Sequence, residues 1–183
     1  MVKIVLLTTA ILMSAALIVV LIAVIIGFLL PKQHVASRAI ALHRKQADVF
    51  QLISDFKAAP SWRSDVREVD LLPPSGGHIH YRERGANGTI TMEIVESNSP
   101  SRMVSQIADK SLPFGGMWIF DISPTAQGCR LNITERGEIY NPVFRFVYRF
   151  FLGYHRTLDT YLQNVSRKFE ESSVPRDGTV ATL

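Results

Sequence analysis

The sequence predicts an α+β fold in which a curved antiparallel sheet of about six or seven strands is covered on one face by a long C-terminal helix. In several short segments apolar and polar residues alternate, and turn signals separate them, as in an antiparallel sheet with one buried face. A long amphipathic segment at residues 142–170 is the expected cover for that face. An uncharged apolar run at residues 4–30 predicts a further helix outside this domain.

The apolar run at residues 4–30 carries no charged residue and ends at Pro31 and Lys32. About 20 apolar residues suffice to cross a bilayer core, because a helix rises about 1.5 Å per residue through about 30 Å of hydrocarbon. The alternative is a cleaved secretory signal, whose apolar centre is roughly 7–15 residues long. The run is about twice that length, so we expect a retained, single-pass membrane anchor.

The basic residues around the run indicate its orientation. Lys3 and the amino terminus precede the run, and four basic residues follow it closely, at Lys32, Arg38, Arg44 and Lys45. Under the positive-inside rule this excess favours a cytoplasmic domain. The alternative is a signal-anchor with Lys3 inside and the domain outside.

The domain begins with a predicted strand at residues 37–43, where Ile40 and Leu42 share one face. Two short helices are expected next, at residues 47–56 and 58–66. Alternation then predicts later strands, most clearly at residues 89–96, 117–123 and 129–139.

Residues 142–170 predict one amphipathic helix of about seven turns. Asn141 is a suitable cap, and Pro142 suits the first turn. The apolar side includes Phe151 and Tyr154, whereas Arg145, Arg149 and Arg156 fall on the opposite side. The tail at residues 171–183 has no periodicity and is expected to be disordered.

Composition excludes several kinds of site. The formal net charge of +4 is too small and too diffuse to indicate nucleic-acid binding. Cys129 is the single cysteine, so neither an internal disulfide nor a cysteine-based metal site is expected. His78 and His80 would share a strand face, but no third ligand lies near them in sequence. The chain also lacks a nucleophile elbow and a phosphate-binding loop, and no cofactor is expected.

One stretch, residues 47–69, combines an apolar pair, an acidic–aromatic pair and a tryptophan at Val49-Phe50, Asp55-Phe56 and Trp62. A hairpin pattern follows at residues 116–122 and 128–134, and the amphipathic helix comes last. In these three features residues 37–170 resemble the START-like superfamily, also called the polyketide cyclase/dehydrase or helix-grip family. The first stretch is the most specific, and the hairpin is similar to the family's penultimate hairpin.

The resemblance implies a helix-grip fold with a deep apolar cavity between sheet and helix that holds a hydrophobic molecule. The side chains expected to line it are Trp62, Met92, Trp118, Phe120, Phe151 and Tyr154. Glu135 continues an inward register, so it is a candidate hydrogen-bond anchor, acid or base. The alternatives are a plain packed core for the aromatic residues and a pairing of Glu135 with Arg84 or Arg136 at the edge of the domain.

We therefore expect a membrane-anchored domain that binds or carries a lipid, quinone or polyketide-like molecule without catalysis. Because the loop after the anchor is short, Arg145, Arg149 and Arg156 are expected to face lipid headgroups. Two alternatives remain. One is a cyclase or dehydrase acting on a membrane-soluble substrate, with Glu135 or a histidine as base. The other is an assembly role in which the domain binds another protein of the envelope.

Overall fold

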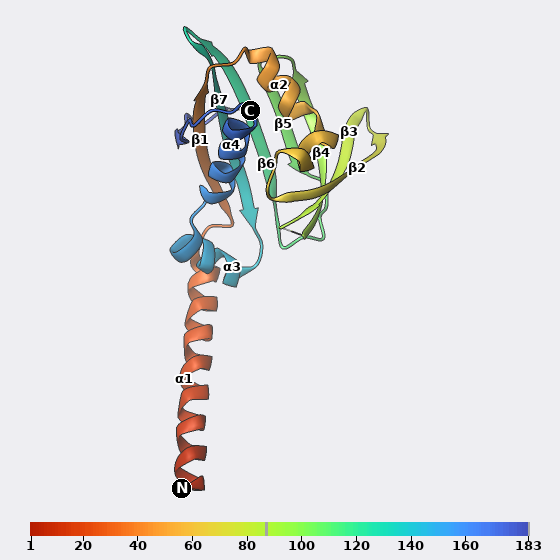
Figure 1. Cartoon of the computed structure of the whole chain (residues 1–183). Coiled ribbons are helices and arrows are strands. Elements are labelled where there is room, and N and C mark those ends of the chain that lie inside the picture. Colours follow the sequence, from red (N-terminus) through yellow and green to blue (C-terminus); the bar gives the residue numbers. More distant parts are fainter. Residues whose placement is uncertain (87, 183) are drawn as a thin grey trace.

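The computed structural model describes residues 1–86 and 88–182 as a long helix joined to one α+β domain (Figure 1). The helix, α1 (Val2–Leu29), projects from the domain. Seven strands follow in the order β1 (Gln33–Leu42), β2 (Val66–Ser75), β3 (His78–Gly85), β4 (Gly88–Asn98), β5 (Arg102–Ile107), β6 (Phe114–Thr125) and β7 (Gly128–Ile139). The helices of the domain are α2 (Gln46–Ser54), η1 (Phe56–Ser61), α3 (Pro142–Val147), η2 (Tyr148–Leu152) and α4 (Arg156–Lys168), and a short strand, β8 (Arg176–Asp177), comes last.

The strands form one antiparallel sheet with the order β2-β3-β4-β5-β6-β7-β1-β8. The predicted fold class is confirmed, and the sheet has one short strand more than expected. Alternate residues of β1, β6 and β7 point to the concave face, where α2 and α4 pack. The core lies there and includes Ile40, Ile122, Leu131 and Leu162.

The C-terminal helix is not the single seven-turn helix that the sequence predicts. Asn141 caps α3 as expected, since its Oδ1 accepts hydrogen bonds from the N–H groups of Val143 and Phe144. The helix then widens into the π-helical turn η2 and ends at Gly153, which adopts φ 70° and ψ 174°. Of the three segments α3, η2 and α4, only α4 packs on the concave face of the sheet. Because the break separates the apolar side chains of α3 and η2 from those of α4, the two segments face different surroundings.

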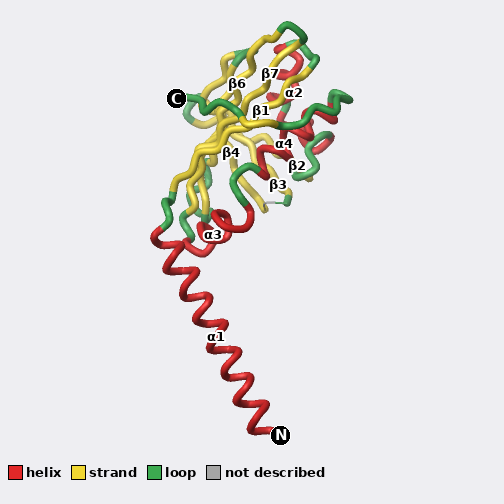
Figure 2. The backbone as a smooth tube through the Cα atoms, turned by 90° about the vertical axis from the view of Figure 1, so that its left-hand side faces the viewer, coloured by secondary structure: helices red, strands yellow, loops and turns green. Residues whose placement is uncertain are grey.

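Within the tail at residues 171–183, residues 176–182 lie against the sheet, while Leu183 lies outside the described residues. β8 pairs with β1 at Arg38 and Ala39, and the following residues run across the outer face of the sheet (Figure 2). We call residues 176–182 the C-terminal strap. Hydrogen bonds to buried side chains of the sheet hold it, with Thr179 O accepting from Ser37 Oγ and Asn132 Nδ2 and with Ala181 N–H donating to Thr134 Oγ1.

Candidate functional site

The strand register brings residues of six strands together in two rows on the concave face. The first row contains Ile94, Ser105, Trp118, Glu135 and Ala36, taken from β4 across to β1. In the second row Tyr81 of β3 pairs with Met92, which pairs with Ile107, while Gly137 of β7 pairs with His34 of β1. Both rows lie toward the end of the sheet where β1 leaves α1 and β7 enters α3, which we call the proximal half (Figure 1).

Burial changes along the strands of this face. In the distal half, away from α1, the sheet is covered by α2, and Ile122, Leu131 and Ile133 are at most 3% exposed. Gln46 at the start of α2 donates to Ile122 O and fixes the helix there. In the proximal half burial is mixed, since Ile94, Ser105 and Ala36 are at most 5% exposed whereas Met92 and Trp118 are only partly buried. The concave face is therefore a closed core at one end and is less completely buried at the other.

Three of the predicted side chains meet around Tyr161 of α4, a residue that the sequence analysis did not select. Its ring centroid lies 5.4 Å from that of Trp62, 5.5 Å from Trp118 and 5.6 Å from Phe120. The contacts with both tryptophans are edge-to-face, an arrangement favoured by the ring quadrupoles. Trp62 and Trp118 thus come to one place from the loop after η1 and from β6, with Tyr161 between them.

Two polar atoms in this region are buried without a hydrogen-bond partner among the described residues. One is the indole Nε1 of Trp62, and the other is the carboxylate Oε2 of Glu135. Buried polar groups in native proteins are nearly always hydrogen-bonded, so the indole N–H and the carboxylate oxygen are the candidates on this face for a hydrogen bond to a further molecule, whether water or ligand.

Glu135 lies on the concave face, opposite Trp118 in the register, and its neighbour there is His34. His34 Nε2 lies 3.7 Å from Glu135 Oε1, and the two side chains are 13% and 20% exposed. The His34 ring stacks on Tyr154 at 4.1 Å between centroids. It also lies against Gly137, where a Cβ would come within 2.2 Å of the ring, so only glycine leaves room for this histidine.

A buried cluster of ionised side chains lies beside Tyr161. Arg63 donates to Asp65 Oδ2 and to Glu83 Oε1, both at 2.6 Å, and its guanidinium lies 5.1 Å from the centre of the Tyr161 ring. Burial raises the pKa of Glu83, although the neighbouring Arg63 opposes that shift. Burial also raises the pKa of the Tyr161 hydroxyl. Since every charge here has a partner, we assign this group to positioning Tyr161.

Two predicted residues lie elsewhere. Phe151 was expected in the cavity, but it precedes the break at Gly153 and is 75% exposed. Arg145 was expected to face headgroups, yet it is 4% exposed. Its Nη1 donates to Leu30 O at 2.8 Å, so it caps the carboxyl end of α1. Arg149 and Arg156 are exposed, as their predicted role requires.

Two open hollows lie on the surface of the domain. One, of about 610 Å³, is formed by η2, Gly153 and the first turns of α4, and Tyr154 is part of its wall. The other, of about 580 Å³, lies at the end of β5 and the start of β6 and is bordered by His80 and Glu93. Within residues 1–86 and 88–182, no three His, Cys, Asp or Glu side chains are arranged to hold a metal ion.

The sheet wrapped on α4, with two short helical segments after β1, defines a START-like fold. Three solved structures share it: a START superfamily protein from Mycobacterium smegmatis (15% identity, TM-score 0.61, 75% of this chain and 97% of that one), norcoclaurine synthase from Thalictrum flavum in complex with dopamine and hydroxybenzaldehyde (11%, 0.60, 76% and 88%), and the protein XoxI from Bacillus cereus (16%, 0.55, 76% and 96%).

The family follows from the sequence. Residues 33–170 match the family described as polyketide cyclase / dehydrase and lipid transport, and the chain belongs to that family. The match begins four residues before the predicted domain and so includes His34. Curated protein sequences gave no match to the chain.

Proposed function

We propose that this protein is a membrane-anchored binding protein for a hydrophobic small molecule that carries a polar group. The ligand would lie on the proximal half of the concave face, beside Trp62, Trp118 and Tyr161. In this proposal Met92 and Tyr154 contribute apolar surface at the edge of the site. Sites of this kind are mostly apolar and contain a few polar groups that fix the ligand's orientation.

The observation that carries the proposal is the pair of unmatched buried atoms, Trp62 Nε1 and Glu135 Oε2. A ligand oxygen can accept from the indole N–H, and a ligand hydroxyl can donate to the carboxylate. Norcoclaurine synthase forms a complex with dopamine and hydroxybenzaldehyde, so a protein of this fold can bind small aromatic molecules. We therefore infer an apolar or aromatic ligand with at least one hydroxyl or carbonyl group.

The anchor in this proposal is α1, which is 28 residues long, has a mean hydropathy of 3.1 over its most apolar window and is almost entirely exposed. A secretory signal would pass the same test of length and composition. The length of the apolar run favours a retained span, and the basic residues that follow it favour a cytoplasmic domain.

An enzymatic function is the second candidate, and the pair formed by His34 and Glu135 favours it. An imidazole and a carboxylate side by side can move a proton to or from a bound substrate. Both side chains lie on the face where we place the ligand. A binding protein would not need the carboxylate charge for turnover, whereas a cyclase or dehydrase that uses Glu135 as its base would.

The test begins with the full chain purified from membranes in detergent. Native mass spectrometry, followed by organic extraction, should reveal a co-purifying hydrophobic molecule. Titrating that molecule into ligand-free protein should change tryptophan fluorescence with saturation. Trp62→Phe removes the indole N–H, and we expect it to weaken binding about tenfold, the equivalent of one hydrogen bond of about 1.4 kcal/mol.

The matched control is Tyr140→Phe, which also removes one polar atom from an aromatic ring, at the exposed residue Tyr140. It should leave the affinity unchanged. Glu135→Gln separates the two candidate functions, since it should alter binding only modestly but abolish turnover if Glu135 is a base. If no hydrophobic molecule co-purifies and Trp62→Phe has no effect on any apolar ligand, the binding function is wrong and the assembly role becomes the better explanation.

A further inference from the structure

The exposed apolar side chains of the domain are concentrated in one short segment. After α1, the described residues include eleven large hydrophobic side chains that are exposed, and five of them fall between residues 143 and 152. The most exposed of these five are Phe151 at 75% and Phe150 at 57%. We call residues 143–152 the aromatic wedge, with the exposed members Val143, Phe144, Phe150, Phe151 and Leu152.

The wedge is held together and keeps a defined shape. Phe146 packs on two of the exposed rings, with centroid distances of 5.0 Å to Phe150 and 6.0 Å to Phe151. Gly153 N–H donates to Tyr148 O at 2.8 Å and closes the π-helical turn. The exposed rings are therefore presented by an ordered helical segment rather than by an irregular loop.

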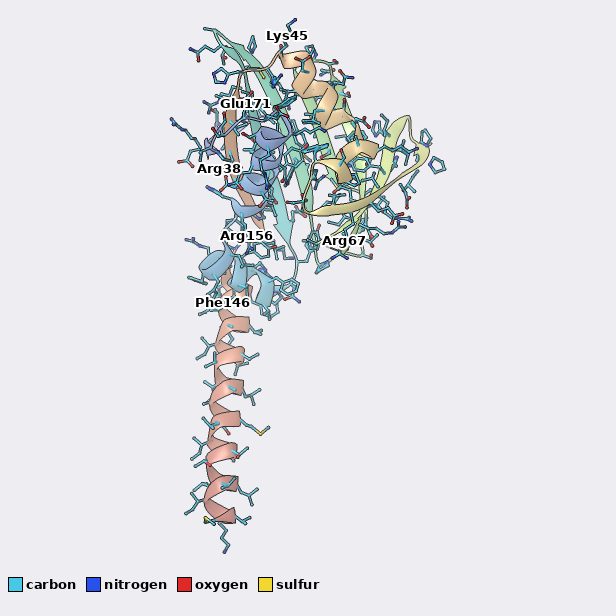
Figure 3. All side chains as sticks on the ribbon, viewed as in Figure 1. Arg38, Lys45, Arg67, Phe146, Arg156 and Glu171 are labelled. Atoms are coloured by element: carbon cyan, nitrogen blue, oxygen red, sulfur yellow. The ribbon has the colours of Figure 1, made fainter. Side chains whose placement is uncertain are left out.

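The wedge is also fixed against the carboxyl end of α1. Gly27 is buried there, and a Cβ at this position would come within 1.9 Å of Pro142 O. Arg145 donates to Leu30 O and lies over the ring of Phe28, with 6.0 Å to its centroid. Figure 3 shows Phe146 at the junction of α1 with the domain. The depth of the wedge in a membrane is therefore set by the depth of Gly27.

The length of α1 places Gly27 at the bilayer surface. If the charge of Lys3 marks one boundary of the hydrocarbon, a rise of about 1.5 Å per residue brings the helix to the other boundary about 20 residues later. Gly27 then lies roughly 6 Å beyond that boundary, within the headgroup layer. In monotopic amphipathic helices, apolar faces that carry Trp, Phe and Leu lie at this boundary.

We propose that the aromatic wedge is a second membrane contact, a monotopic segment whose phenylalanines insert into the boundary between headgroups and acyl chains beside α1. This inference rests on the proposed membrane anchoring. It assigns Phe151 to the bilayer instead of to the ligand site, and it leaves the exposed Arg149 able to reach lipid phosphates. Two contacts fix the orientation of the domain, with the proximal half of the concave face nearer to the lipid than the distal half.

Spin labels on the full chain in phosphatidylcholine and phosphatidylglycerol vesicles test this proposal. Cys129 is 0% exposed and sits in the core, so labels can be directed to Phe151→Cys, to the control Val174→Cys and to Ile11→Cys in α1. Val174 is 70% exposed and apolar like Phe151, but lies beyond α4, outside the wedge. Power-saturation measurements compare the access of oxygen, which concentrates in the bilayer, with that of a water-soluble nickel chelate.

We expect labels at residues 11 and 151 to favour oxygen and the label at residue 174 to favour the nickel chelate. If residue 11 favours oxygen but residue 151 behaves like residue 174, α1 spans the membrane and the wedge does not insert. If residue 11 itself favours nickel, the proposed anchoring fails. A label at residue 151 that is shielded from both reagents and coupled to a second label within about 20 Å would show contact with another copy of the chain and overturn the bilayer assignment.

The double variant Phe150→Ser, Phe151→Ser with a label at Leu152→Cys provides an independent measurement. Removing two inserted rings should raise nickel access at residue 152 severalfold, because the segment withdraws from the acyl boundary. The matched change Val174→Ser should leave access at residue 152 unchanged. Equal access in both backgrounds would contradict insertion, and an unchanged far-ultraviolet circular dichroism spectrum would establish that the variants fold.

Discussion

The distal and proximal halves of the concave face are built from the same strands, but their side chains differ in burial and polarity. On β7, Leu131 and Ile133 are fully buried, and Glu135, two residues further along the same face, is paired with a histidine and has an unmatched oxygen. On β6, buried Ile122 and Phe120 give way to the partly buried Trp118. A closed core at one end of a strand therefore supports polar and aromatic side chains that are less completely buried at the other.

The largest test of this contrast is a pair of substitutions on one face of β7. Leu131→Asp places an unpaired charge in the distal core, which costs several kcal/mol out of the roughly 5–15 kcal/mol available to a domain. The domain should fail to fold. Glu135→Leu removes a carboxylate that has one unmatched oxygen and should change the free energy of unfolding by less than about 1 kcal/mol. Chemical unfolding followed by circular dichroism measures both, and similar losses would show that the halves do not differ.

Truncation to alanine compares the halves with neutral side chains. Leu162 is 0% exposed and belongs to the buried core of the domain, so Leu162→Ala should cost about 2–5 kcal/mol. Met92 is half-buried in the proximal half, where solvent can fill the space left behind. We expect Met92→Ala to cost less than about 2 kcal/mol in the same unfolding measurement. A cost for Met92→Ala equal to that of Leu162→Ala would indicate a closed, tightly packed proximal half.

The outer face of the sheet depends on the C-terminal strap. Deleting residues 176–183 should leave the buried polar side chains of Asn132 and Thr134 without their partners in the strap, at a cost of about 1–3 kcal/mol. Thr134→Val should cost less in the truncated protein than in the full chain, because the partner has already gone. A double-mutant cycle of unfolding free energies checks this, and strict additivity would show that the strap does not bind Thr134.

The smallest expected effect is the pH dependence of stability that arises from Glu93, on the outer face of the proximal half. A hydrogen bond from His78 Nδ1, and a second from Gln106, lower the pKa of Glu93 from its ordinary value of 4.5. On acidification the unfolded chain takes up this proton first. The stabilisation by Glu93 is therefore present above pH 4.5 and is lost as the pH falls through the lower folded pKa.

Glu93→Gln should remove that part of the pH dependence. Its effect on the free energy of unfolding should be below about 1 kcal/mol, since the pair lies near the solvent. Unfolding curves of both proteins between pH 3 and 6 measure it, and parallel pH profiles would rule the contribution out.

The sheet was predictable because a strand with one buried face has apolar side chains at every second residue, as at Leu131 and Ile133. The break at Gly153 was not, because the apolar spacing on each side of it still fits a single helix. His34 was missed because β1 begins at Gln33, before the alternation becomes visible at residue 37. The strap is held by backbone groups and polar side chains, which leave no hydrophobic period. Arg145 resembles a surface arginine in sequence, and only its contact with Leu30 reveals that it is buried.

The two margins of the sheet, where its edge strands lie, affect whether two chains confined to one plane can pair through their sheets. A sheet ends in unpaired N–H and C=O groups that can recruit the sheet of a neighbouring molecule. At one margin β8 occupies β1 at Arg38 and Ala39. At the other, β2 contains Pro73 and Pro74, which have no N–H to donate. If α1 anchors the chain as proposed, domains that diffuse side by side in a membrane would collide at these margins far more often than free ones, and the short β8 and the two prolines would oppose the growth of such contacts into continuous intermolecular sheets.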